Sequence, residues 1–338
     1  MTAAFLSSTR FVEHETGPGH PERPDRLRAV HRALREAKLL SSPDPFPEFE
    51  LDLGPFEPDE PYTPLAEVEL SAQPPEALTE SVLSVHTKQH LAHMQAVCAG
   101  RKTLDDPDTK VCPASYEVAL LAVGAAKQAV DLVVGKQHRR AFVAARPPGH
   151  HAEHHRAMGF CLFNNVVIAA RHAQDAHDIE RVAIVDFDVH HGNGTQTVTE
   201  DDPTILFVST HQNPRTCYPG TGHADEVGFG PGRGSVLNLP LDVGTDDGRY
   251  LEVFDAKVLP ALDKFKPQLI LVSAGFDAHE QDPLAHLRMT EVGFEAVTRR
   301  LVEAAETHCD GRLVSLLEGG YDLVGLGRSV VRHAAALS

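Results

Sequence analysis

The sequence contains no tryptophan, and it has only four methionines and five tyrosines among its 338 residues. It also lacks any apolar run near the roughly 20 residues that a membrane-spanning helix needs, which argues against an integral membrane protein. Its first residues, MTAAFLSSTR, do not have the basic and then apolar pattern of a secretory signal. We therefore expect a cytoplasmic protein that does not act at a membrane.

Cysteine is also scarce. The five cysteines are an odd number and are widely spaced, without the close pairs of a thiolate zinc site. This pattern favours reduced thiols over a disulfide framework. We expect any metal ligands to be other residue types.

Basic residues are outnumbered, with 31 Lys and Arg against 48 Asp and Glu, for a formal charge of −17. Such a balance argues against nucleic-acid binding, because that affinity comes from neutralising phosphates with Lys and Arg. An acidic surface attracts a cationic substrate, but it also serves solubility alone.

The order of segments indicates one α/β domain over residues 1–338. Residues 41–75 are rich in Pro, Asp and Glu and predict a long surface excursion. Helical periodicity marks residues 115–134 and 164–174, between apolar segments with strand character. The predicted strands are AFVAAR (141–146), VAIVDFD (182–188), ILFVST (205–210), LILVSA (269–274) and LVSLLE (313–318).

Four of these strands run into polar clusters at their carboxyl ends, where parallel sheets place their active sites. Asp186, Asp188 and His190 project to one side of an extended chain. Asp188, His190 and Asp277 predict a three-ligand divalent metal site with a position left for water. The alternative is that they are capping or salt-bridged loop residues, but gathering these carboxylates without a cation is unfavourable.

Two further motifs supply groups for acid and base chemistry. His150 and His151 follow a rigid Arg-Pro-Pro-Gly turn, and imidazole titrates near neutral pH. Tyr321 follows two glycines and offers a phenol that can donate to a developing oxyanion, although a tyrosine in such a turn is also a common packing residue.

Together these segments resemble the histone deacetylase family, in particular its class II and bacterial amidohydrolase-like branch. The resemblance covers nearly the whole chain. Its motifs, in order, are HETGPGHPERPDRL (14–27), RPPGHHAEHHRAMGFCLFNN (146–165), DFDVHHGNGTQ (186–196), YPGTG (218–222), SAGFDAHEQDP (273–283) and LEGGYDL (317–323). The resemblance implies the arginase/deacetylase fold, with a mainly parallel eight-stranded sheet flanked by helices.

The resemblance also implies a role for each matching position, in a metal-dependent hydrolysis of acyl-lysine amides by water. The zinc ligands would be Asp188, His190 and Asp277, although iron(II) suits such a mixed site too. His151 would be the general base and acid, with Asn193 behind it. His150 would assist electrostatically, with Asp186 behind it, and Tyr321 would polarise the acyl carbonyl.

Other matching positions would shape the surroundings. The substrate tunnel would be walled by Gly159, Phe160 and Tyr218, with Leu284 at its mouth. A structural potassium ion would be held by Asp186, Asp188, His190, Ser209 and Thr210.

Two other substrate classes stay open. Arginase-like ureohydrolases need further carboxylates for a second metal, but Gly192 and His279 occupy those positions here. Acetylpolyamine hydrolases place an acidic residue where this chain has Leu284, a residue that suits the apolar stem of acyl-lysine in a protein or peptide. Nearby acidic residues, namely Glu280, Asp106 and Asp108, could still select a polyamine.

A non-enzymatic acyl-lysine binder would have lost a ligand or the tyrosine. This chain retains both.

Overall fold

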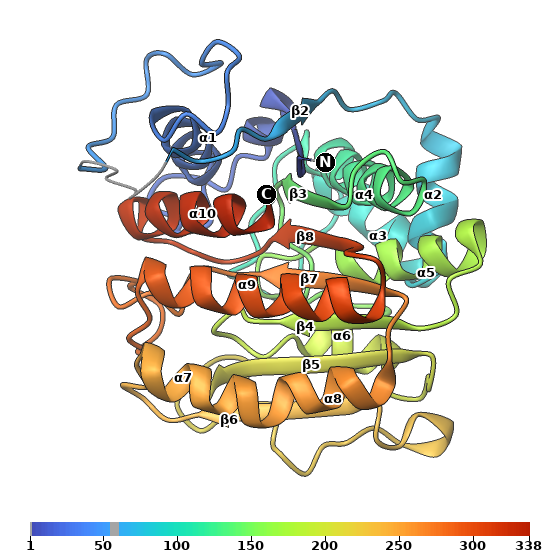
Figure 1. The fold of residues 1–338 in the computed structure, drawn as a ribbon. Coiled ribbons are helices and arrows are strands. Elements are labelled where there is room, and N and C mark those ends of the chain that lie inside the picture. Colours follow the sequence, from blue (N-terminus) through green and yellow to red (C-terminus); the bar gives the residue numbers. More distant parts are fainter. Residues whose placement is uncertain (1, 55–60) are drawn as a thin grey trace.

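Eight parallel strands form the centre of the computed structural model, which describes residues 2–54 and 61–338. The strand order in the sheet is β2-β1-β3-β8-β7-β4-β5-β6 (Figure 1). The strands are β1 (Ala4–Ser7), β2 (Ala66–Val68), β3 (Arg140–Ala144), β4 (Val182–Asp186), β5 (Ile205–Gln212), β6 (Val236–Leu241), β7 (Leu269–Ala274) and β8 (Leu313–Leu317).

The central strands β3, β4, β7 and β8 are buried along their whole length. Their runs of Val, Ile, Leu and Ala are typical of parallel strands that are covered by helices on both faces. The prediction of one α/β domain around an eight-stranded sheet is confirmed, and the sheet is entirely parallel.

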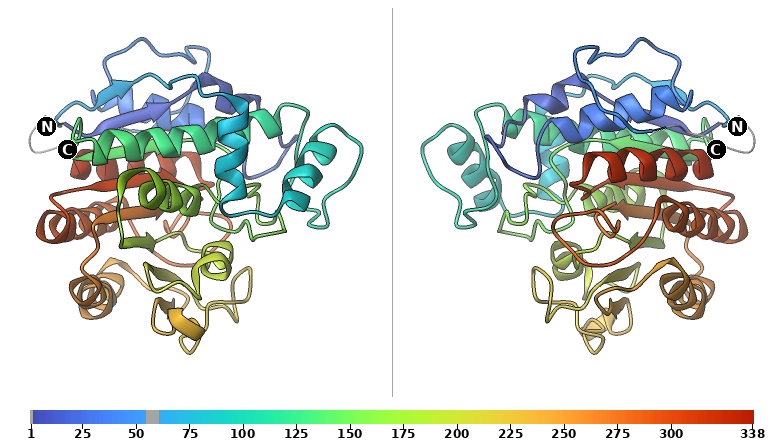
Figure 2. Two further views of the ribbon diagram at one scale, coloured as in Figure 1. Left: turned by 90° about the vertical axis from the view of Figure 1, so that its right-hand side faces the viewer. Right: turned by 90° about the vertical axis from the view of Figure 1, so that its left-hand side faces the viewer.

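Helices cover both faces of the sheet. In the left view of Figure 2, α8 to α10 lie on one side, and α2 and α3 project on the other. The α-helices are α1 (Asp25–Glu36), α2 (Pro75–Leu83), α3 (Lys88–Cys98), α4 (Ser115–Val134), α5 (Asn165–His177), α6 (Asn193–Thr199), α7 (Asp247–Val253), α8 (Leu259–Phe265), α9 (Glu291–His308) and α10 (Leu323–Leu337). Short 3-10 helices span Thr9–Glu13 and Gly230–Gly232, and a π-helical turn spans Phe254–Val258. None of the helices in the described ranges is long and apolar enough to cross a membrane.

The segment 41–75 is mostly on the surface, as predicted, but it also adds a strand to the sheet. Strand β2 pairs with β1 at the edge, and Leu53 and Leu65 are buried. Residues 55–60 of this segment lie outside the described residues. The missed strand is three residues long, too short to show a periodic pattern.

The carboxyl ends of the strands point to the left in Figure 1, where long loops gather. The loops after β3, β4, β7 and β8 carry most of the predicted site residues, while Asp186 ends β4, Ser209 and Thr210 lie in β5, and Tyr218 follows β5. Because β4 and β8 both pair with β7, the side chains that follow these strands are brought together.

Candidate active site

Three side chains with metal-ligand chemistry meet beyond β4 and β7. The Nδ1 atom of His190 lies 3.0 Å from Oδ1 of Asp188 and 3.1 Å from Oδ2 of Asp277. All three residues are buried, and one ligand atom from each lies within 4.8 Å of the others. The structure therefore brings the three predicted metal ligands to one point.

The charge around this point fits a divalent cation. Burial alone lowers the pKa of His190, but hydrogen bonds with Asp188 and Asp277 raise that pKa well above its ordinary value. Two buried carboxylates are unfavourable unless a positive charge lies beside them. Either a proton on the His190 imidazole or a metal ion supplies that charge. The outer carboxylate oxygens are already oriented, because Gly319 N–H donates to Asp188 (2.8 Å) and Val189 N–H donates to Asp277 (2.9 Å).

The two neighbouring histidines have opposite electrostatic surroundings. The Nδ1 atom of His150 lies 2.9 Å from Oδ2 of Asp186. Burial lowers the pKa of His150, but the Asp186 and Asp188 carboxylates outweigh burial and raise the pKa to about 10. His150 is therefore an imidazolium at neutral pH.

His151 stays neutral at the same pH. Its pKa is well below the ordinary value because the ring is buried and faces the positive charge of His150. Its Nδ1–H donates to Oδ1 of Asn193 (2.7 Å), and Asn193 in turn donates to Glu153 (2.8 Å). This tautomer leaves Nε2 of His151 as a free base.

The loop that carries both histidines is fixed by a residue that the sequence analysis did not single out. Glu318 accepts hydrogen bonds from the backbone N–H groups of Gly149 (2.7 Å) and His150 (3.2 Å). Burial raises the pKa of Glu318 to about 7. The sequence signal that could have identified Glu318 is its position in the EGGYD motif, three residues before Tyr321.

Tyr321 is held between two loops. Its backbone N–H donates to Oδ2 of Asp282 (2.7 Å), whose Oδ1 accepts from the N–H of Leu284 (3.0 Å). The phenol ring packs against the Arg26 guanidinium. Burial raises the pKa of the Tyr321 hydroxyl well above the ordinary value. The hydroxyl therefore keeps its proton and can donate it in a hydrogen bond. Asp282 and Arg26 were not identified from the sequence.

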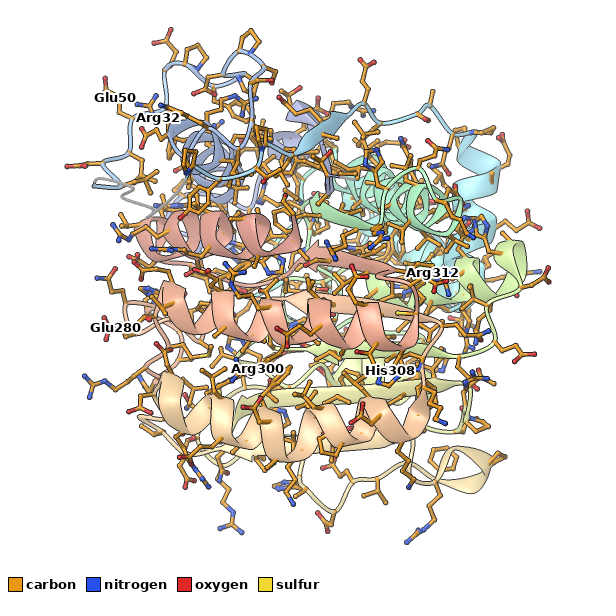
Figure 3. The ribbon with its side chains drawn as sticks, viewed as in Figure 1. Arg32, Glu50, Glu280, Arg300, His308 and Arg312 are labelled. Atoms are coloured by element: carbon orange, nitrogen blue, oxygen red, sulfur yellow. The ribbon has the colours of Figure 1, made fainter. Side chains whose placement is uncertain are left out.

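A cavity of about 210 Å³ leads to these groups. All four predicted tunnel residues line it, together with three catalytic or metal-site candidates and two acidic residues. The lining is Asp106, Asp108, His151, Gly159, Phe160, His190, Tyr218, Leu284 and Tyr321. Glu280, labelled in Figure 3, is exposed and does not belong to this lining.

One wall of the cavity depends on glycine. Gly159 has a φ of +56°, and a Cβ there would overlap the ring of His151. Its N–H donates to Oδ2 of Asp106 (2.9 Å), which ties the wall to the acidic rim. Only glycine adopts this backbone conformation so close to the imidazole without strain.

The predicted potassium positions include Asp188 and His190 of the first cluster, and the other three lie on the neighbouring strands β4 and β5. Asp186 of β4 is the register partner of Ser209 of β5, and the Thr210 hydroxyl donates to the backbone oxygen of Asp186 (3.3 Å).

His279 stands at one of the two positions where ureohydrolases need a further carboxylate. His279 accepts a hydrogen bond from Gln281 N–H and lies 3.7 Å from Glu291, and it belongs to none of the groups of possible metal ligands among the described residues. This contact set argues against a two-metal ureohydrolase site.

Comparison with known proteins agrees with this geometry. The histone deacetylase domain model matches residues 20–337. A probable deacetylase of Archaeoglobus fulgidus is 38% identical over 96% of this chain and 83% of its own length. The histone deacetylase-like amidohydrolase of Pseudomonas aeruginosa is 42% identical over 76% of this chain and 67% of its own.

A solved structure gives the same result. The crystal structure of the HDA15 HD domain superposes with a TM-score of 0.84 and 33% identity, over 98% of this chain and 87% of that one. The predicted family and fold are thereby confirmed. The chain belongs to the histone deacetylase family and has the hydrolytic deacetylase architecture of that family.

Proposed function

We propose that this protein is a zinc-dependent deacylase that hydrolyses the amide of acetyl-lysine, or a related acyl-lysine, in proteins or peptides. One observation carries the proposal. His151, His190 and Tyr321 all line the cavity, so an acyl chain that enters it meets a base, a member of the metal-ligand set and a hydrogen-bond donor together.

The protein's own groups account for the proton movements. His151 is neutral and has a free Nε2 atom, so it takes a proton from the attacking water and later gives it to the leaving amine. Tyr321 stays protonated and donates to the oxygen of the tetrahedral intermediate. The positive charge of the His150 imidazolium stabilises the negative charge that develops on the substrate during the reaction.

Asp188, His190 and Asp277 are the residues that would hold the zinc ion. When bound there, zinc supplies Lewis acidity toward the amide carbonyl and toward water. Iron(II) suits the same ligands. Asp186, Asp188, His190, Ser209 and Thr210 are our proposed surroundings for a structural potassium ion.

The rim favours a lysine side chain over a polyamine. Leu284 is partly exposed at the cavity mouth and offers an apolar contact to the methylene stem of lysine. Asp106 is already engaged, because it accepts hydrogen bonds from Gly159 N–H and from the Thr109 hydroxyl (2.7 Å). Asp108 also lines the mouth, and this carboxylate is the observation that keeps acetylpolyamines as the second candidate.

Substrate competition tests the choice. An acetyl-lysine peptide, acetylputrescine and acetylspermidine are compared by kcat/KM in the wild type and in Leu284→Glu. We expect the wild type to prefer the peptide and Leu284→Glu to lose part of that preference, because the new carboxylate attracts a second ammonium group. A wild-type preference for the polyamines would contradict the lysine assignment.

A further inference from the structure

A second cluster of ligand-type side chains lies on the molecular surface, outside the active site. Asp131 belongs to α4, and His172 and His177 belong to α5, the helix that packs against α4. The Nε2 atoms of His172 and His177 lie 2.7 Å and 2.6 Å from the same oxygen, Oδ1 of Asp131.

Regular helix spacing does not produce this convergence. Residues five apart are separated by roughly 140° around an α-helix, so His172 and His177 do not share one face. His177 is the last residue of α5, and the chain turns at Asp178, which has a left-handed φ of 54°. The helix end therefore lets the second imidazole fold back toward Asp131.

We propose that Asp131, His172 and His177 form a second binding site for a divalent transition metal, with zinc as the bound ion. Two imidazoles and one carboxylate are a common zinc ligand set, and three protein ligands leave a coordination position for water. The side chain of Asp131 is 50% exposed, while those of His172 and His177 are 17% and 23% exposed. Water can therefore reach the ion, and the imidazoles are already partly desolvated.

The movement needed to admit the ion is small. With zinc bonds of about 2.0 to 2.1 Å and tetrahedral angles, ligand atoms stand about 3.3 Å apart. The two nitrogen to oxygen distances must therefore lengthen by somewhat more than half an ångström. Because Asp131 is half exposed, rotation of its carboxylate provides this movement without shifting either helix.

The neighbouring lysine does not bind the Asp131 carboxylate. Lys127, one helical turn before Asp131, donates instead to the Ser81 hydroxyl (2.6 Å). An ion at this site would link the C-terminal end of α5 to α4. Since metal binding to the folded state alone raises its stability, zinc at this site should stabilise the protein against heat.

A matched control is present elsewhere on the surface. His308 Nε2 lies 2.7 Å from Oδ1 of Asp263, the same distance as in the His172 contact. Among the described residues, no second histidine joins His308 at the Asp263 carboxylate to make a group of possible metal ligands. His308, labelled in Figure 3, is the last residue of α9.

The experiment measures bound zinc per chain after equilibrium dialysis of the holoenzyme, with its catalytic site loaded first, against buffered low-micromolar zinc. We expect two zinc ions in the wild type and in His308→Ala, and one in His177→Ala and Asp131→Asn. The asparagine variant keeps a hydrogen-bond acceptor for the imidazoles but removes the anionic ligand, so it separates metal binding from helix packing.

Thermal unfolding provides a second readout. The zinc taken up beyond the catalytic ion should raise Tm in the wild type and in His308→Ala, and should leave Tm unchanged in His177→Ala. Equal zinc content in the wild type and in both site variants would overturn the proposal. These results do not depend on which substrate the enzyme hydrolyses.

Discussion

Two groups of carboxylate and imidazole side chains among the described residues could hold a metal ion, one at the carboxyl edge of the sheet and one between α4 and α5. In the first, Asp188, His190 and Asp277 are buried, and their nitrogen to oxygen distances are 3.0 and 3.1 Å. In the second, one half-exposed carboxylate accepts from two imidazoles at 2.6 and 2.7 Å.

The difference lies in what surrounds the ligands. The buried cluster opens into a cavity that also contains a neutral histidine and a protonated tyrosine. The exposed cluster of Asp131, His172 and His177 does not belong to the lining of that cavity. The same ligand chemistry therefore predicts catalysis in one place and, at most, metal binding in the other.

A large loss of activity should come from removing the hydrogen-bond donor beside the buried cluster. Tyr321→Phe deletes the hydroxyl but keeps the ring that packs on Arg26. We expect kcat to fall roughly 100- to 1000-fold, equivalent to about 3 to 4 kcal/mol of transition-state stabilisation, with the catalytic metal content unchanged. Peptide deacylation kinetics and elemental analysis measure both. Tyr218→Phe is the matched control, and equal losses in the two variants would show that Tyr321 has no special role.

A smaller effect should follow from a charge placed behind the base. Asn193→Asp puts a carboxylate on Nδ1 of His151, which favours the imidazolium and raises the pKa of His151. Since catalysis needs the neutral ring, the acid limb of kcat/KM should move by about 1 to 3 units toward higher pH. A pH profile checks this, and an unmoved or acid-shifted limb would contradict the role of His151 as base.

The smallest effect should come from the exposed cluster. In metal-free buffer Asp131→Asn should change the free energy of unfolding by less than about 1 kcal/mol, because exposed pairs are screened by solvent. It should also leave kcat/KM for the peptide unaltered. Urea unfolding measures the first quantity, and a loss of several kcal/mol would mean that this cluster is a structural anchor of α4 and α5.

The buried cluster was predictable from the sequence, and the exposed one was not. Asp186 ends β4, and Asp188 and His190 follow it at alternate positions. The strand order needed to bring Asp277 beside them is usual for parallel sheets. Asp131 and His177 are 46 residues apart on two helices, and no local pattern marks their contact.

The supporting groups were hidden for a similar reason. Arg26 stands 294 residues before the Gly320 carbonyl that it contacts, and Asp282 supports Tyr321 through backbone N–H groups. Backbone contacts of this kind leave no signature in residue type. Among the strands, β1 and β2 are four and three residues long, and β6 contains Pro240, so their periodicity was too weak to predict them.

The most direct test of the account is restoration of activity by metal. The wild type and His190→Ala are stripped with a chelator, confirmed to be folded by circular dichroism, and assayed on an acetyl-lysine peptide before and after stoichiometric zinc. We expect the stripped wild type to be inactive and to regain turnover with one zinc per chain, while His190→Ala stays inactive. Full turnover in the stripped wild type, or restoration of His190→Ala to the wild-type rate, would contradict a catalytic metal held by Asp188, His190 and Asp277.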